Sequence, residues 1–337
     1  MANIATKNPP NSEIDALLNL YNSGNLLQTE KVCRKLLESY PESAFIFNLL
    51  GMVFGSQGKS SEAISNYEKA CQLNPDYADA YNNLGIVLAN LGHQQEAIER
   101  LENAVRIDPD FGDASNNLGV MLQNLGQHEA ALKSLSNAVR LKPNCAFTHF
   151  NYANSLRARG KLDEALSIYN KAINLNPNYF QAYNNRGNLL EDLHEYEEAW
   201  KSFTKSIQLK PDYAVAYSNR GLVQKKIGNY GGAIEDFTKA IEFDSWTSDP
   251  ADQNLKSRLY VNLGDSLMIL RKHGEALAAY DEALNIDPGN QNLIGMKGNA
   301  VAALGRIEEG LKLKQEGYGV VSFDSLEGVS IRHGRTQ

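Results

Sequence analysis

Residues 78–111 read ADAYNNLGIVLANLGHQQEAIERLENAVRIDPDF, and this stretch decides the fold. It holds two amphipathic patterns, YNNLGIVLANLG and HQQEAIERLENAVRI, which are separated by a short turn and followed by a proline. In the first pattern, helical spacing gathers Tyr81, Leu84 and Leu88 on one side and places Asn83 on the other. Because proline cannot continue an α-helix, the stretch predicts a hairpin of two helices.

The same pattern recurs with a period of 34 residues. The period is marked first by prolines, at Pro41, Pro75, Pro109, Pro143, Pro177 and Pro211. Ten residues after each proline stands a small residue, at Gly51, Gly85, Gly119, Ala153, Gly187 and Gly221. One such unit cannot bury its apolar face alone, so successive hairpins are expected to stack on each other.

The residues Tyr81, Leu84, Gly85, Leu88, Gly92, Ala97, Leu101, Ala104 and Pro109 together resemble the signature of the tetratricopeptide repeat (TPR) family. The resemblance implies an all-α fold, a right-handed α-solenoid superhelix of about nine helix-turn-helix units. The units are expected at residues 10–43, 44–77, 78–111, 112–145, 146–179, 180–213, 214–247, 257–290 and 291–317. The last unit departs from the pattern, with Gly310, Lys314 and Gly317 where helix-packing residues are expected.

Three segments lie outside the regular repeats. Residues 1–9 are expected to form an N-terminal tail, and a nine-residue insertion lies near residues 245–253. Ser248 or Asp249 before Pro250 reads as a helix cap, so the insertion should lengthen the first helix of the eighth unit. It is either a tolerated insertion or a functional lip. In the C-terminal tail, residues 318–337, VVSF and VSI flank DSLEG and predict a small hairpin.

Composition and charge exclude several classes of protein. The chain has 33 Lys and Arg against 40 Asp and Glu and no long basic run, so no nucleic-acid partner is expected. Binding in the pentatricopeptide manner would require 35-residue units and a basic groove, and both are missing. The longest apolar stretch, residues 44–55, is too short to span a membrane. Cys33, Cys71 and Cys145 lack CxxC spacing and read as buried thiols of a cytoplasmic protein.

No motif predicts catalysis. GSQGKS at residues 55–60 lacks the leading glycine of a phosphate-binding loop, because Val53 stands in its place. The six histidines have no metal-binding spacing, and the carboxylates of EYEEA at residues 195–199 fall where acidic residues favour a helix start. The chain is therefore expected not to be an enzyme, and no catalytic residue, metal or cofactor is predicted.

Asparagine recurs at one position of six consecutive units, at Asn83, Asn117, Asn151, Asn185, Asn219 and Asn262. This row resembles the TPR arm of O-linked N-acetylglucosamine transferases. The resemblance implies that the asparagines line a concave groove and hold the main chain of an extended peptide, since an amide both donates and accepts hydrogen bonds. Consensus TPR sequences also favour asparagine here for hydrogen bonds between repeats, and the two roles are compatible.

Other polar residues are expected in the same groove. Asparagine also occupies the preceding position in three units, at Asn82, Asn116 and Asn184. TPR proteins that bind chaperone tails need lysine there, so binding of such tails is not expected. Arg157, Lys225 and Lys226 add charge to the groove, either for a ligand or for ion pairs between repeats.

The leading functional hypothesis is a non-enzymatic scaffold that binds an extended segment of a partner protein in its concave groove. The alternative is the substrate-recruiting arm of a glycosyltransferase, sulfotransferase or oxygenase whose catalytic part is absent or on another chain. The sequence leaves no room for a catalytic domain after the repeats, which favours the first hypothesis. The terminal repeats also offer surfaces through which copies of the chain could form a homo-oligomer.

Overall fold

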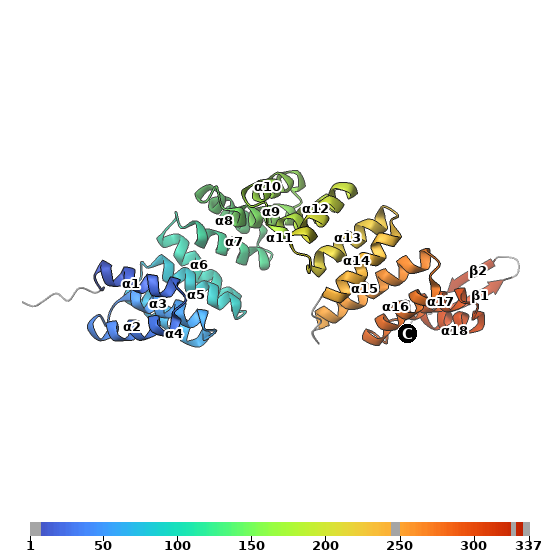
Figure 1. The fold of residues 1–337 in the computed structure, drawn as a ribbon, viewed down its shortest axis with the longest axis horizontal. Coiled ribbons are helices and arrows are strands. Elements are labelled where there is room, and N and C mark those ends of the chain that lie inside the picture. Colours follow the sequence, from blue (N-terminus) through green and yellow to red (C-terminus); the bar gives the residue numbers. More distant parts are fainter. Residues whose placement is uncertain (1–7, 244–249, 325–327, 333–337) are drawn as a thin grey trace, which may run out of the picture. The chain divides into compact units, whose positions relative to one another are not determined.

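The computed structural model describes residues 8–243, 250–324 and 328–332. These residues form eighteen helices and two strands (Figure 1). The helices are α1 (Asn11–Asn22), α2 (Leu26–Ser39), α3 (Ala44–Ser56), α4 (Ser60–Leu73), α5 (Ala78–Asn90), α6 (Gln94–Ile107), α7 (Gly112–Asn124), α8 (His128–Leu141), α9 (Ala146–Ala158), α10 (Leu162–Leu175), α11 (Phe180–Asp192), α12 (Tyr196–Leu209), α13 (Ala214–Lys226), α14 (Tyr230–Phe243), α15 (Pro250–Ile269), α16 (His273–Ile286), α17 (Gln291–Ala303) and α18 (Ile307–Tyr318). The prediction of about nine helix pairs is confirmed.

The chain divides into two compact units, residues 1–175 and 176–337. In the first unit, a continuous core runs from α1 to α8 and includes Leu17, Leu49, Leu84 and Leu118. The core of the second unit includes Phe237, on α14. Each unit is thus a stack of hairpins that share a core with their neighbours along the chain.

Within a hairpin, the small residues of the first helix receive a large side chain of the second. A Cβ at Gly119 would lie 2.5 Å from Leu135 Cγ, and a Cβ at Gly187 would lie 2.6 Å from Phe203 Cε1. Either contact is too short for a real side chain, so alanine there would push the helices apart. The turn of the hairpin needs glycine for another reason, because Gly92 has a φ of +83°.

The insertion and the C-terminal tail form the local structures predicted for them, where the structure describes these residues. Helix α15 contains 20 residues against 13 in α13, and it begins at Pro250, as expected for a helix lengthened at its N-terminal end. The predicted caps Ser248 and Asp249 lie outside the described residues. The tail forms an antiparallel hairpin of β1 (Val320–Asp324) and β2 (Gly328–Arg332), which adds two strands to the otherwise helical fold.

Among the described residues, no helix combines the length and the apolar character needed to cross a membrane.

Candidate functional site: an asparagine row beside a groove

Six asparagines of the first unit lie on the first helices of successive repeats and are joined to one another. We call them the amide row: Asn48 on α3, Asn82 and Asn83 on α5, Asn116 and Asn117 on α7, and Asn151 on α9. Within the pairs, Asn82 and Asn116 are buried, while Asn83 and Asn117 are half-buried. The row therefore has a buried edge and a partly accessible edge.

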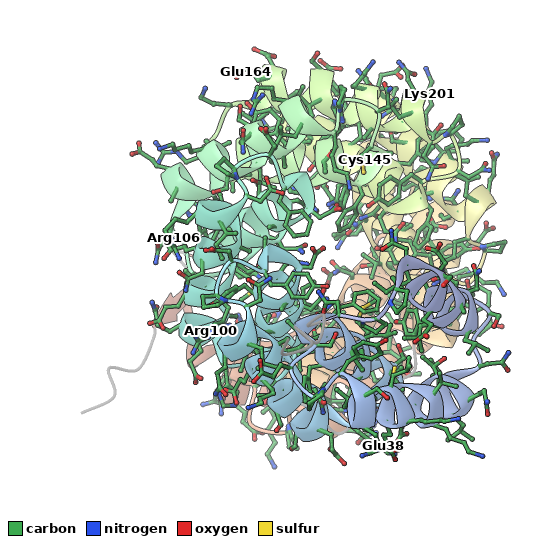
Figure 2. The ribbon with its side chains drawn as sticks, turned by 90° about the vertical axis from the view of Figure 1, so that its left-hand side faces the viewer. Glu38, Arg100, Arg106, Cys145, Glu164 and Lys201 are labelled. Atoms are coloured by element: carbon green, nitrogen blue, oxygen red, sulfur yellow. The ribbon has the colours of Figure 1, made fainter. Side chains whose placement is uncertain are left out.

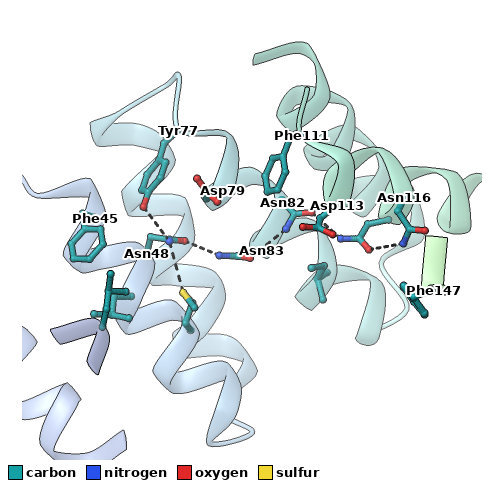
Figure 3. Close-up of a pocket in the computed structure, with 15 residues that line it drawn as sticks. Phe45, Asn48, Tyr77, Asp79, Asn82, Asn83, Phe111, Asp113, Asn116 and Phe147 are labelled. Carbon is teal, nitrogen blue, oxygen red and sulfur yellow. Dashed lines mark hydrogen bonds between the residues drawn. The ribbon is translucent and has the colours of Figure 1, made fainter. Parts of the chain in front are cut away.

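The amide row is held together by hydrogen bonds between repeats (Figure 3). In each of them, an Nδ2 atom donates to the Oδ1 atom of an asparagine 35 residues earlier: Asn83 to Asn48 at 3.1 Å, Asn117 to Asn82 at 2.9 Å, and Asn151 to Asn116 at 2.9 Å. Within a repeat, Asn82 donates to Asn83 and Asn116 to Asn117, both at 3.4 Å. The row ends where Asn48 Nδ2 donates to the Tyr77 hydroxyl at 3.3 Å.

The second unit repeats part of this arrangement. Asn219 Nδ2 donates to Asn184 Oδ1 at 3.1 Å, and Asn184 Nδ2 donates to Asn185 Oδ1 at 3.2 Å. Asn262 instead accepts from Lys225 Nζ at 2.9 Å. The predicted hydrogen bonding between repeats is therefore confirmed in both units.

Burial limits which amides a ligand can reach. Asn82, Asn116 and Asn184, which the sequence placed in the peptide-binding set, expose only 6%, 2% and 2% of their surface. The half-buried Asn83 and Asn117 present more. The sequence did not show this division, because both members of each pair recur with the same period.

A groove of about 550 Å³ lies beside the amide row in the first unit. We call it the amide groove, and Figure 3 shows it in close-up. Five of its lining residues belong to the amide row, and the others are Leu18, Phe45, Leu49, Met52, Tyr77, Asp79, Ile86, Phe111, Asp113 and Phe147. Amides, aromatic rings and two carboxylates thus line one depression.

Two apolar side chains of the groove are unusually accessible. Phe147 is 53% exposed and Ile86 is 38% exposed. Neither residue was predicted from the sequence as part of a site. The signal for Ile86 was present, because it lies on the same face of its helix as Asp79 and Asn83 and is the apolar member of a polar face.

A smaller cavity of about 150 Å³ adjoins the amide groove. The two share Ile86, Asn116, Asn117 and Phe147 as lining residues. The remaining walls of the smaller cavity are mainly apolar, at Ala89, Asn90, Leu101, Val120 and Met121. We call this smaller cavity the apolar pocket.

The predicted basic residues of the second unit are engaged with acidic partners. Lys226 Nζ lies 2.8 Å from Glu191 Oε1, and this contact raises the pKa of the Lys226 ammonium. Lys225 Nζ lies 3.2 Å from Asp265 Oδ2. Ion pairing between repeats is therefore confirmed for these two lysines. Arg157 is half-buried in the last turn of α9.

Two of the three cysteines are deeply buried. Burial raises the pKa of the Cys33 thiol to about 12 and that of the Cys71 thiol to about 11. Cys145 is half-buried at the N-terminal end of α9 (Figure 2). In the described part of the chain, His, Cys, Asp and Glu side chains do not gather in groups of three or more that could hold a metal ion.

Models of known protein families match the chain along the same repeats. Models described as TPR repeat match residues 51–92 and 153–194, and models described as tetratricopeptide repeat match residues 78–111, 101–133, 180–213, 214–245 and 257–290. Together these matches cover more than half of the chain. A search of curated proteins found no significant match.

Solved structures of similar fold include Cut9–Hcn1 of the APC/C, with 16% identity over 86% of this chain and 55% of that chain, and a TM-score of 0.59. PilF of Pseudomonas aeruginosa is 21% identical over 64% of this chain and 96% of that chain, with a TM-score of 0.57. YrrB, described as a TPR protein with an unusual peptide-binding site, is 29% identical over 58% of this chain and 97% of that chain, with a TM-score of 0.49. On its repeats and these family matches, the chain belongs to the tetratricopeptide repeat family.

Proposed function

We propose that this chain is a non-enzymatic interaction scaffold that holds an extended segment of a partner protein in the amide groove. One observation carries the proposal. Half-buried amides and accessible apolar side chains line the same depression of about 550 Å³. Binding sites for peptides combine these two features, a few placed polar groups and an apolar surface.

The asparagine amides can form hydrogen bonds with a ligand while they also join the repeats. A primary amide has two N–H donors and two acceptor lone pairs. Asn83 and Asn117 each use one N–H and one lone pair within the amide row, so each retains one donor and one acceptor. Main-chain groups of an extended peptide need such partners whatever their side chains are. The hydrogen bonds between repeats also fix the amides in place, which lowers the entropy cost of binding.

The apolar side chains supply the gain in affinity. Phe147 and Ile86 lie in the groove with 53% and 38% of their surface exposed. Burying apolar surface is favourable by about 25 cal/mol per Å². A ligand that covers both side chains would therefore gain affinity that is independent of its main-chain contacts.

The test uses these apolar side chains, because replacing an amide also removes a bond between repeats. A phage-displayed library of random dodecapeptides is selected on the wild-type protein, and the selected peptides are synthesised. We expect Phe147→Ser and Ile86→Ser each to weaken their binding about tenfold, which corresponds to about 1.4 kcal/mol of lost apolar burial.

The matched control is Leu27→Ser, which removes a side chain on α2 that is 79% exposed and lies outside the groove. It should leave binding unchanged. Melting curves of all three variants establish that the repeats stay folded. Failure to select any peptide, or peptides that bind the Phe147 and Ile86 variants as tightly as the wild type, would refute the proposal.

A further inference from the structure

The amide groove carries an unbalanced negative charge. Two carboxylates, Asp79 and Asp113, line it, and none of its lining residues within the described chain is Lys or Arg. Asp113 is neutralised by an ion pair with Lys142. Asp79 is exposed, and among the described residues it has no hydrogen bond or ion pair. The groove therefore offers one free carboxylate to a ligand.

The negative charge of Asp79 affects Tyr77, a residue that lines the groove. Burial, and next to it the negative charge of Asp79, raise the pKa of the Tyr77 phenol to about 12. Tyr77 lines the groove and binds the end of the amide row. Figure 3 shows Asp79 drawn between the rings of Tyr77 and Phe111. A cation bound at Asp79 would therefore lie at the groove and not on the outer surface of the repeats.

The apolar pocket has the size for one side chain. A cavity of about 150 Å³ with apolar walls can accommodate a group as large as benzene. Its walls include Ile86, Val120 and Met121, and it lies next to the groove, because four residues line both. One bulky apolar side chain of a peptide in the groove could therefore enter it.

The distance between the Asp79 carboxylate and the apolar pocket follows from helix geometry. Asp79 and Ile86 are seven residues apart on α5, which corresponds to a rise of roughly 10 Å along the helix. An extended peptide advances about 3.3 Å per residue, so about three residues cover this distance.

From these observations we infer that the preferred ligand is a segment with a Lys or Arg about three residues from a bulky apolar residue. The basic side chain pairs with Asp79, and the apolar one enters the apolar pocket. The inference rests on the proposed function and adds the chemical class of the partner to it. An acidic segment would meet the free carboxylate and bind less well.

The test uses fluorescein-labelled dodecapeptides of Gly and Ser that contain one Lys and one Leu at separations of one to five residues. Anisotropy titration at low salt should give the tightest binding at separations of two to four. Replacing Lys with Ala should weaken binding about three- to fivefold, as for a partly exposed ion pair, and Glu should weaken it further. Replacing Leu with Ala should weaken it about tenfold.

Variants assign these effects to residues. Asp79→Asn should abolish the preference for Lys over Ala, and Asp79→Lys should reverse the preference to Glu. The matched control is Asp76→Asn, in the turn before α5 and outside the groove, which should change nothing. Salt at 0.5 M, where the screening length is only a few Å, should remove the Lys preference and leave the Leu preference intact.

The failure of this inference is distinct from that of the proposed function. Equal binding of Lys, Ala and Glu peptides, or a Lys preference that survives Asp79→Asn, would overturn the inference. Peptides selected from the random library would then still depend on Phe147, and the scaffold proposal would stand. Loss of all peptide binding in both experiments would overturn both.

Discussion

The two units of the chain place different chemistry at the same repeat position. In the first unit, this position holds Leu84 and Leu118, which are buried in the core. In two repeats of the second unit it holds Arg186 and Arg220, and the next repeat returns to leucine at Leu263. Arg220 forms a two-pronged contact with Asp236, through Nε at 2.8 Å and Nη2 at 2.7 Å, and its Nη1 donates to Thr204 at 3.1 Å. One repeat architecture thus accepts either an apolar contact or a buried ion pair.

The difference extends to the ties between repeats. In the first unit, neutral amides connect α3, α5, α7 and α9. In the second unit, the amide bond from Asn219 to Asn184 is accompanied by ion pairs of Lys225 with Asp265 and of Lys226 with Glu191, which also join first helices. Neutral hydrogen bonds respond little to salt, and exposed ion pairs are screened by it. The comparison shows that the 34-residue period determines where the helices contact each other. The interaction at that contact, an amide hydrogen bond or an ion pair, varies between repeats.

The largest effect is expected from Arg220→Leu, which gives the second unit the side chain that the first unit uses. Asp236 is buried, with 3% of its surface exposed, and would lose its cation. An uncompensated buried charge costs about 3–5 kcal/mol. We expect faster hydrogen exchange across α13 and α14 and a lower melting temperature.

The double variant Arg220→Leu/Asp236→Leu is the matched control, because it removes both charges and should recover most of the lost stability. Lys239→Leu removes an exposed lysine from a pair with Glu242 and should have almost no effect. A single Arg220→Leu variant as stable as the wild type would show that the two units do not differ in the way described.

A smaller effect is expected from Asn116→Ala in the first unit. The substitution removes the acceptor of Asn151 and the donor to Asn117, and it leaves the buried Asn151 amide without this partner. We expect a cost of about 1–3 kcal/mol. Asn124→Ala, at the exposed end of the same helix, is the control and should be neutral. An unchanged stability of Asn116→Ala would mean that the amide row does not tie repeats together.

Labelling of the cysteines tests whether the loss of stability in Asn116→Ala is confined to the first unit. All three lie in residues 1–175, and Cys33 and Cys71 react with a thiol reagent only when the surrounding helices open. At pH 8 the raised pKa values of both buried thiols suppress the reaction further. Asn116→Ala should accelerate labelling of Cys71, which packs against α5 and is nearer to the row, while Arg220→Leu should not.

The smallest effect is expected from Lys226→Met. The Lys226 side chain is 47% exposed and pairs with Glu191, so the pair should contribute no more than about 0.5 kcal/mol. Melting curves at low and high salt measure it. The wild type and the variant should differ slightly at low salt and coincide at high salt. A loss of stability that persists at high salt would point to the cation–π contact of Lys226 Nζ with the Tyr196 ring, whose centroid is 5.5 Å away.

The sequence predicted the hairpins well because each boundary has a local physical cause. Pro109 follows the end of α6, and Gly92 adopts the left-handed conformation that the turn requires. The last repeat shows where local reasoning failed. Gly310 and Gly317 looked like departures from the pattern, yet a Cβ at Gly317 would lie 2.3 Å from the backbone nitrogen of Gly295. Only a view of both helices reveals this contact of backbone with backbone.

The candidate site was predicted less completely. The period of 34 residues identified the asparagine positions, but the hydrogen bonds between repeats join residues 35 apart, as in Asn117 to Asn82. A search for identical positions cannot show such a bond, because it links the second member of one pair to the first member of the previous pair. The same search could not find Phe147, since the equivalent residues of the two preceding repeats are Asp79 and Asp113.

The amide row has a direction. The hydrogen bonds follow one order, from Asn151 through Asn116, Asn117, Asn82 and Asn83 to Asn48, so that each amide donates to the next one, and the Tyr77 hydroxyl accepts the last bond. Rotating one amide by half a turn would set donor against donor and acceptor against acceptor, so a reversal must include all six. A hydroxyl can donate as well as accept, so Tyr77 can terminate the row in either sense. The amides of four repeats therefore form one chain of hydrogen bonds whose direction can reverse only as a whole. The main chain of a bound peptide would take the orientation in which its own N–H and C=O groups match that direction.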